Sequence, residues 1–175
     1  MKGSVLKEIR FDTRSIARAG MIAAMYIVLT LVTPFTFSFG AVQFRVAEAL
    51  TTLPILTIDA VPGLFVGCLA ANLLGGGVWY DVALGSVATL LAALCTRRTR
   101  KLPFLAAAWP TVFNGLIVGP VVYFAYVRAP GDPLSLPTLL FTMGTVALGE
   151  VAVCYVLGLP LTFALRKLPA DIIGE

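Results

Sequence analysis

The chain has 175 residues, of which 59% are hydrophobic and 13% are charged, at a mean hydropathy of +0.94. A soluble domain carries about 25% charged residues, so this composition excludes an ordinary water-soluble protein. The absence of histidine removes the usual general base, the Ser-His-Asp triad and the commonest ligand of zinc and haem. The sequence also lacks the Gly-x-x-x-x-Gly-Lys-Ser/Thr phosphate loop, so an ATP-driven process would need a separate ATPase.

Apolar runs bounded by charge, proline or glycine predict six membrane-spanning helices. They cover approximately residues 17–33, 43–56, 57–74, 79–96, 102–127 and 137–165. At about 20 apolar residues per span, these helices form one bundle, so the predicted fold class is an all-α integral membrane protein. The single transmembrane domain, 1–175, comprises an N-terminal segment (1–16), the six-helix bundle (17–167) and a C-terminal tail (168–175).

Basic residues are divided unequally between the two ends of the predicted bundle. Eleven of the 13 lie before the first helix, between the fourth and fifth, or after the sixth: Lys2, Lys7, Arg10, Arg14, Arg18, Arg97, Arg98, Arg100, Lys101, Arg166 and Lys167. Only Arg45 and Arg128 lie at the other end. Because Lys and Arg accumulate on cytoplasmic flanks, both termini are predicted to be cytoplasmic in a multi-pass protein of the cell membrane. These clusters lie against apolar spans without interleaved aromatic residues, which indicates contact with lipid headgroups and not with nucleic acid.

The three cysteines, Cys68, Cys95 and Cys154, lie inside apolar runs and lack the paired spacing of a metal or redox site. They are predicted to be packing residues. The sequence therefore indicates no catalytic residue, no metal site and no cofactor bound by this chain.

Charged residues near the starts of the second and fourth spans are the first candidates for a binding site, because charge inside a membrane is expensive and is a functional candidate by default. Arg45 and Glu48 are three residues apart and share one face of the second helix. They either neutralise each other or orient a carboxylate toward a ligand. Asp81 opens the fourth helix after a glycine triplet, where it either favours the helix dipole or contacts the ligand.

Two further polar residues lie near the middles of the antiparallel fifth and sixth helices. Asn114 and Glu150 are therefore expected at similar depth, able to face each other. Glu150 has no basic neighbour in the sequence. Either it is protonated and hydrogen-bonded to Asn114 or Asn72, or it receives a ligand amine, a cation or a pair of N–H groups.

Small residues spaced by four recur on the first, third and fifth helices, and this spacing lets membrane helices approach closely. The pairs include Ala19 with Ala23, Gly20 with Ala24, and Gly63 with Gly67. Packing within the bundle is the default interpretation of each pair.

Several polar and small-residue motifs together carry a family resemblance. They are AVQFRVAEALT at 41–51, Leu-Pro at 53–54, VPGLFVGC at 61–68, ANLLGG at 71–76, DVALGS at 81–86 and Asn-Gly at 114–115. With these motifs the chain resembles the QueT family of queuosine-precursor transporters, which are substrate-binding S components of energy-coupling factor (ECF) transporters.

The resemblance implies a six-helix S component that captures a micronutrient from outside and works with a transmembrane coupling subunit and two ATPases that use ATP. The implied ligand is preQ1, an aminomethyl-deazaguanine, or a related queuosine precursor. Its N–H edge and protonated amine suit carboxylates, and its ring suits aromatic stacking. The expected substrate-binding residues are Gln43, Phe44, Arg45, Glu48, Asn72, Trp79, Asp81, Asn114, Tyr123 and Glu150. Ala19 and Ala23 match the small-residue motif by which S components dock on the coupling subunit.

Other functions stay open on the sequence alone. The chain can be an S component for another micronutrient, or an intramembrane enzyme using Glu48, Asp81 or Glu150 as acid or base, although no nucleophile or metal cluster accompanies them. A channel or scaffold would use the same polar residues without retaining a small molecule.

The division of basic residues predicts the sidedness of the bundle. Single cysteines introduced at Lys2 or Thr99 should react with membrane-impermeant thiol reagents only from the cytoplasm. Those at Gly76 or Asp132 should react only from outside. The opposite pattern of labelling in intact cells and inverted vesicles would show that the bundle is inserted the other way.

Overall fold

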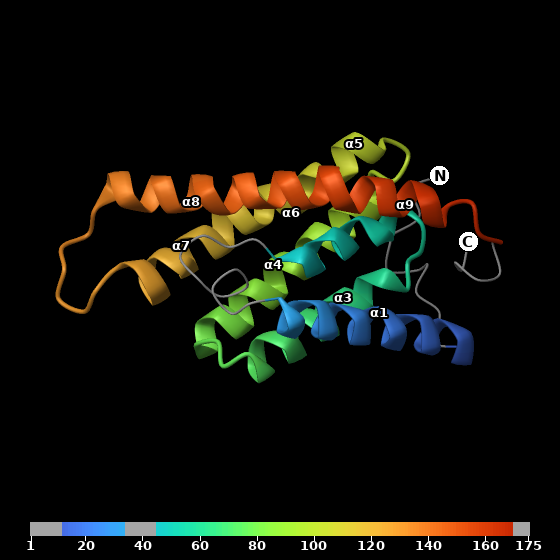
Figure 1. The fold of residues 1–175 in the computed structure, drawn as a ribbon, viewed down its shortest axis with the longest axis horizontal. Coiled ribbons are helices and arrows are strands. Elements are labelled where there is room, and N and C mark those ends of the chain that lie inside the picture. The colour runs from blue at the N-terminus through green and yellow to red at the C-terminus, as the bar shows by residue number, and fades with distance from the viewer. Residues whose placement is uncertain (1–11, 34–44, 170–175) are drawn as a thin grey trace.

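The computed structural model describes residues 12–33 and 45–169, and within these ranges the chain is entirely helical, without β-strands. The helices form an elongated bundle in which α1 and α9, the first and last helices, lie at one end near the limits of the described chain (Figure 1). The start of α1 at Thr13 and the end of α9 at Leu165 thus occupy the same end of the bundle. The expected all-α class is confirmed.

The first helix, α1 (Thr13–Val32), begins four residues before the predicted start, because Asp12 caps it. The Asp12 carboxylate accepts a hydrogen bond from the Ser15 backbone N–H at 2.7 Å, which satisfies one of the free donors of the first turn. The helix ends where Thr33 turns to extended backbone (φ −66°, ψ 133°). Thr33 precedes Pro34, and the residue before proline is disfavoured in the helical region.

The second predicted span forms a short 3₁₀ helix, η2 (Val46–Ile55), followed by α3 (Ala60–Leu74) and α4 (Trp79–Arg98). Every residue from 47 to 55 is buried, so η2 is surrounded by the other helices. Its central position explains its apolar sequence on all sides.

Local changes of helical type interrupt the last two predicted spans. The fifth consists of α5 (Pro103–Ala106), α6 (Ala108–Phe113), the π-helical segment η3 (Asn114–Val118), α7 (Gly119–Val122) and a second π-helical segment, η4 (Tyr123–Val127). The sixth consists of α8 (Leu136–Val151), the π-helical segment η5 (Ala152–Gly158) and α9 (Leu159–Leu165). Proline at 120 and 160, which cannot donate a backbone hydrogen bond, lies beside these changes of helical type.

Four helical stretches of the described chain are long and apolar enough to cross a bilayer: Thr13–Val32, Trp79–Arg98, Pro103–Val127 and Leu136–Leu165. The other two, η2 and α3, have 10 and 15 residues, shorter than the roughly 20 residues of a full span. The structure thus agrees with a multi-pass membrane protein in which two of the six predicted spans are short.

Helices α1 and α3 pack at very short range through small residues, side by side in Figure 1. A Cβ added at Gly63 would lie 2.7 Å from the Ala19 carbonyl oxygen, and one at Gly67 would lie 3.0 Å from the Ala23 Cα. Ala19 and Ala23 thus pack against α3 within the chain. Docking of a coupling subunit at these two residues stays a prediction.

The end of η2 is fixed by a residue that the sequence assigned to a basic loop. Helix α4 extends through Arg97, whose side chain is buried and donates to the carbonyl oxygens of Leu56 at 3.1 Å and Pro54 at 3.4 Å. A cation at the end of a helix satisfies free carbonyl groups and opposes the helix dipole. Arg97 therefore joins α4 to η2 in addition to adding positive charge at this end.

The contact between α1 and α3 predicts a stability difference between two glycine substitutions. In Gly67→Ala the new methyl group would meet Tyr26 Cβ at 2.9 Å, so the helices must separate, at a cost of about 1–3 kcal/mol. Gly144→Ala, on the exposed side of α8, meets nothing within 4 Å and is the matched control. Thermal unfolding in detergent should show a lower midpoint for Gly67→Ala only. Equal midpoints for the two variants would contradict this packing.

Candidate ligand-binding site

Polar side chains from separate helices converge inside the bundle. The charged and amide residues that sequence reasoning selected and the structure buries are Arg45, Glu48, Asn72, Asp81, Asn114 and Glu150, all at most 8% exposed. Arg45 caps η2, which carries Glu48, while the others come from α3, α4, η3 and α8. Packing of η2 against its neighbours thus brings together groups that are up to 105 positions apart in the sequence.

A small cavity of about 10 Å³ lies among four of these side chains. Its lining consists of Arg45, Glu48, Gly85, Thr89, Asn114, Val118 and Glu150. A cavity of this size holds about one water molecule, so a larger ligand enters only if the surrounding side chains move apart. Four of the predicted binding residues therefore line one enclosed space.

Glu48 presents one satisfied and one unsatisfied oxygen at this cavity. The Tyr26 hydroxyl donates a hydrogen bond to Glu48 Oε1. Within the described chain Glu48 Oε2 has no hydrogen-bond partner, although it is shielded from solvent. The Glu48 carboxylate is thus bonded to α1 through Oε1, and Oε2 remains available to accept a hydrogen bond.

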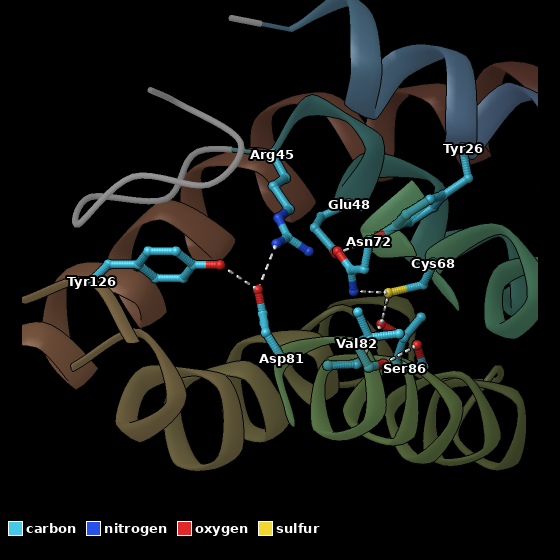
Figure 2. Close-up of polar contacts among 11 residues, drawn as sticks. Tyr26, Arg45, Glu48, Cys68, Asn72, Asp81, Val82, Ser86 and Tyr126 are labelled. Carbon is cyan, nitrogen blue, oxygen red and sulfur yellow. Dashed lines mark hydrogen bonds and ion pairs between the residues drawn. The ribbon is translucent and has the colours of Figure 1, made fainter. Parts of the chain in front are cut away.

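Asp81 is bound by partners from two other elements, as Figure 2 shows. Its Oδ2 accepts a hydrogen bond from the Tyr126 hydroxyl at 3.1 Å and lies 4.0 Å from Arg45 Nη2. Its other oxygen, Oδ1, lacks a hydrogen-bond partner among the described residues. Arg45 therefore pairs with an acid distant in sequence, and Asp81 also occupies the first turn of α4, as predicted.

Asn72 on α3 lies beside Gly85, which is one turn after Asp81 on α4. Asn72 Nδ2 is 3.5 Å from the Cys68 sulfur, and Asn72 Oδ1 is the third buried oxygen without a hydrogen-bond partner in the described ranges. A Cβ added at Gly85 would lie 3.2 Å from Asn72 Nδ2 and 3.6 Å from Asp81 Oδ1. The missing side chain at Gly85 thus leaves space beside both polar groups.

Glu150 is hydrogen-bonded to Asn114, which is a contact that the sequence offered as one of two alternatives for Glu150. Asn114 Nδ2 donates to Glu150 Oε1 at 2.7 Å, and the Cys154 sulfur lies 3.7 Å from Oε2. Asn114 is the first residue of the π-helical segment η3. Since π-helical turns frequently occur at functional sites, this distortion aims a polar group at the cavity where a regular helix would place it differently.

Three unsatisfied acceptors decide what the site can bind. Leaving a buried acceptor without a hydrogen bond costs about 1–3 kcal/mol, so Glu48 Oε2, Asn72 Oδ1 and Asp81 Oδ1 together favour a ligand with several donors. The acids around Arg45 also outnumber it, which favours a cationic ligand.

The expected aromatic residues are not part of this cavity. Trp79 is 79% exposed and makes an edge contact with Tyr80. Tyr123 is buried, but its hydroxyl accepts a hydrogen bond from the Ser135 backbone N–H at 2.9 Å, and it does not line the cavity. Neither residue lines this cavity, and stacking of either one on a ligand stays a prediction. Gln43 and Phe44 lie outside the described residues.

Sequence reasoning missed five residues of the site: Tyr26, Gly85, Thr89, Val118 and Tyr126. Tyr26 could have been noticed as a hydroxyl in an otherwise apolar part of the first span, and Tyr126 lies one helical turn after Tyr123. Gly85 and Thr89 carry no signal of their own in the sequence, since small and β-hydroxyl residues are common in membrane helices.

A helical bundle of several membrane-crossing helices around a small polar cavity is the arrangement of a membrane protein that binds a polar solute. Residues 16–167 match the model of the family described as QueT transporter, and the chain belongs to this family. It is 27% identical over 153 residues to the queuosine precursor transporter QueT of Lactococcus lactis subsp. cremoris (strain MG1363), an alignment that covers 82% of this chain and 88% of the relative. No solved structure matches the chain.

Proposed function

We propose that this chain is the substrate-binding S component of an ECF transporter and that it captures preQ1, or a related deazaguanine, from outside the cell. The observation that carries the proposal is the set of three unsatisfied acceptors on Glu48, Asn72 and Asp81. The relative in Lactococcus lactis is named as a queuosine precursor transporter, which supports a ligand of this class.

The chemistry of preQ1 complements the site. Its guanine-like edge carries N–H donors that a carboxylate accepts, and its aminomethyl group is a cation at neutral pH. We assign the N–H edge to Glu48, whose Oε2 is free at the cavity. Glu150, across the same cavity and already bonded to Asn114, is the candidate partner of the amine. Cationic charge on the ligand would balance the excess of acids around Arg45.

The proposed orientation has six spans and both termini in the cytoplasm. Arg45 and Asp81 lie at the starts of η2 and α4, while Arg97 lies at the opposite end of α4 and contacts the end of η2. With the basic residues of 97–101 in the cytoplasm, the Arg45–Asp81 pair lies toward the outside. A ligand captured from outside would then reach the cavity past this pair.

The partners in this proposal are a transmembrane coupling subunit and two ATPases, which use the ATP that this chain has no phosphate loop to bind. An apolar groove between α1, η2 and α9 supports a docking surface in this part of the bundle. The groove has a volume of about 270 Å³, and its lining includes Met21, Met25, Leu53, Leu161 and Leu165. Gly20 and Ala24 continue the exposed side of α1 beside it. Flexible methionine side chains are common at adaptable binding surfaces.

The direct test of the proposal is binding of labelled preQ1 to the purified chain, with guanine and riboflavin as competitors. Unlabelled preQ1 should displace the label, and riboflavin should not. Chemical conversion of preQ1 by the isolated chain would instead support an enzyme. Failure to retain preQ1 would support a channel, a scaffold or an S component for another micronutrient.

The two cavity acids should respond differently to amide substitution. Glu48→Gln keeps the shape but can turn a donor toward the ligand's donors, so it should weaken preQ1 binding by about 2 kcal/mol or more. Glu150→Gln keeps an acceptor for Asn114. If Glu150 has only a structural role, this variant should bind preQ1 with nearly normal affinity. A loss of affinity comparable to that of Glu48→Gln would place Glu150 against the ligand amine. Titration calorimetry on folded, monodisperse variants measures both. Unchanged affinity in Glu48→Gln would remove Glu48 from the ligand site.

The docking surface predicts a separation of binding from assembly. Gly20→Leu with Ala24→Leu adds bulk on the exposed side of α1, so the variant should bind preQ1 but fail to co-purify with the coupling subunit. Gly144→Leu, which adds bulk on exposed α8, should assemble normally. Normal assembly of the Gly20 and Ala24 variant would exclude this side of α1 as the docking surface.

A further inference from the structure

The hydroxyl of Tyr26 reaches from α1 to the carboxylate that faces the cavity. Tyr26 is 0% exposed, and its hydroxyl donates to Glu48 Oε1 on η2. Figure 2 shows the tyrosine ring extending from α1 toward the polar groups of η2 and α3. Tyr26 does not line the cavity itself, so its effect on a ligand must pass through Glu48.

The position of the Tyr26 side chain is fixed by its surroundings. A Cβ added at Gly67 would come within 2.9 Å of Tyr26 Cβ, so α1 and α3 are in contact at this level. Thr30 Oγ1 donates to the Tyr26 carbonyl oxygen at 2.8 Å one turn later. That bond holds the backbone of Tyr26, and full burial leaves the ring little freedom. Its hydroxyl is therefore a fixed point to which one carboxylate oxygen is bonded.

A fixed donor on Oε1 determines where Oε2 points. The terminal torsion of a glutamate side chain is broad and has no sharp preferred angle, so a lone carboxylate would rotate freely. With Oε1 bonded to Tyr26, the second oxygen remains unsatisfied on a side chain that lines the cavity. Pre-orientation of this kind reduces the ordering that ligand binding would otherwise require.

We propose that Tyr26 is a positioning residue for ligand capture, holding Glu48 so that Oε2 accepts from the N–H edge of the ligand. This inference rests on the proposed function, since it takes preQ1 as the ligand of the cavity. It assigns to α1 a role in ligand specificity. A ligand that lacks N–H donors facing Glu48 Oε2 would gain no binding free energy from the orientation of this oxygen.

The test compares Tyr26→Phe with Tyr155→Phe in the complete chain. Both substitutions remove one tyrosine hydroxyl, but the Tyr155 hydroxyl donates to the Phe104 carbonyl oxygen, away from the cavity. The ligands are preQ1 and its analogue without the 2-amino group. Tyr26→Phe should weaken preQ1 binding about tenfold or more and should reduce the discrimination between the two ligands, whereas Tyr155→Phe should leave both affinities unchanged.

A double variant separates positioning from general damage to the fold. If Tyr26 acts through Glu48, adding Tyr26→Phe to Glu48→Gln should cause little further loss of preQ1 affinity, because the oriented carboxylate is already absent. Two results overturn the inference. One is wild-type affinity in Tyr26→Phe. The other is an equal loss for both ligands that simply adds to the loss in Glu48→Gln.

A spectroscopic measurement covers the case in which Tyr26→Phe does not fold. With 3-fluorotyrosine at position 26, the ¹⁹F resonance should shift when preQ1 binds, and this shift should shrink in Glu48→Gln. A resonance indifferent to preQ1 in a chain that binds preQ1 overturns the role of Tyr26 alone. If the unsubstituted chain does not bind preQ1 at all, the proposed function fails as well.

Discussion

Desolvation of carboxylates inside a membrane bundle is the constraint on which this structure depends. Glu48, Asp81 and Glu150 are buried with Arg45 in a chain whose other buried side chains are largely apolar. Each such group costs about 2.5–3.5 kcal/mol to place at the centre of a membrane helix on insertion scales, unless neighbours satisfy it. Hydrogen bonds within the fold offset part of this desolvation free energy. Each of the three acids accepts one, from Tyr26, Tyr126 or Asn114. Glu48, which keeps one oxygen unsatisfied, lines the cavity, and Asn72 and Asp81, which also keep an unsatisfied oxygen, lie beside Gly85 in its lining. These unsatisfied groups link the energetics of the fold to ligand binding.

Close helix packing is the second requirement, because the donors must reach the acids from different helices. Gly63 and Gly67 let α1 approach α3, which puts the Tyr26 hydroxyl within reach of η2. At the other side of η2, a Cβ added at Gly158 would lie 2.8 Å from Thr52 Cγ2, and Thr52 donates to the Gly158 carbonyl oxygen at 3.0 Å. The small residues therefore serve the site indirectly, by holding the short helix η2 at the centre of the bundle.

Much of this organisation could be predicted from the sequence. Hydropathy located the helices, and the cost of buried charge selected Glu48, Asp81 and Glu150, which the structure buries as expected. The ion pairs could not be predicted in the same way. Their spacing in the sequence suggested that Arg45 pairs with Glu48, but packing of α4 against η2 places Asp81 within 4.0 Å of Arg45.

The sequence is least informative where one pattern has two physical explanations. An Ala-x-x-x-Ala spacing serves internal and external contacts equally well, and the structure uses Ala19 and Ala23 internally. Aromatic residues near the ends of spans suit both a ligand and the membrane interface, and exposed Trp79 fits the interface. Changes of helical type at η3, η4 and η5 were also beyond sequence reasoning, because a single extra residue in a turn leaves hydropathy unchanged.

Ligand capture by Glu48 is tested most directly by an experimental structure of the chain with preQ1 bound. We expect preQ1 in the cavity between η2 and α8, with its N–H edge within hydrogen-bonding distance of Glu48 Oε2 and the Tyr26 hydroxyl still bonded to Oε1. Density for preQ1 elsewhere in the bundle, with Glu48 unchanged and without a ligand contact, would contradict this expectation.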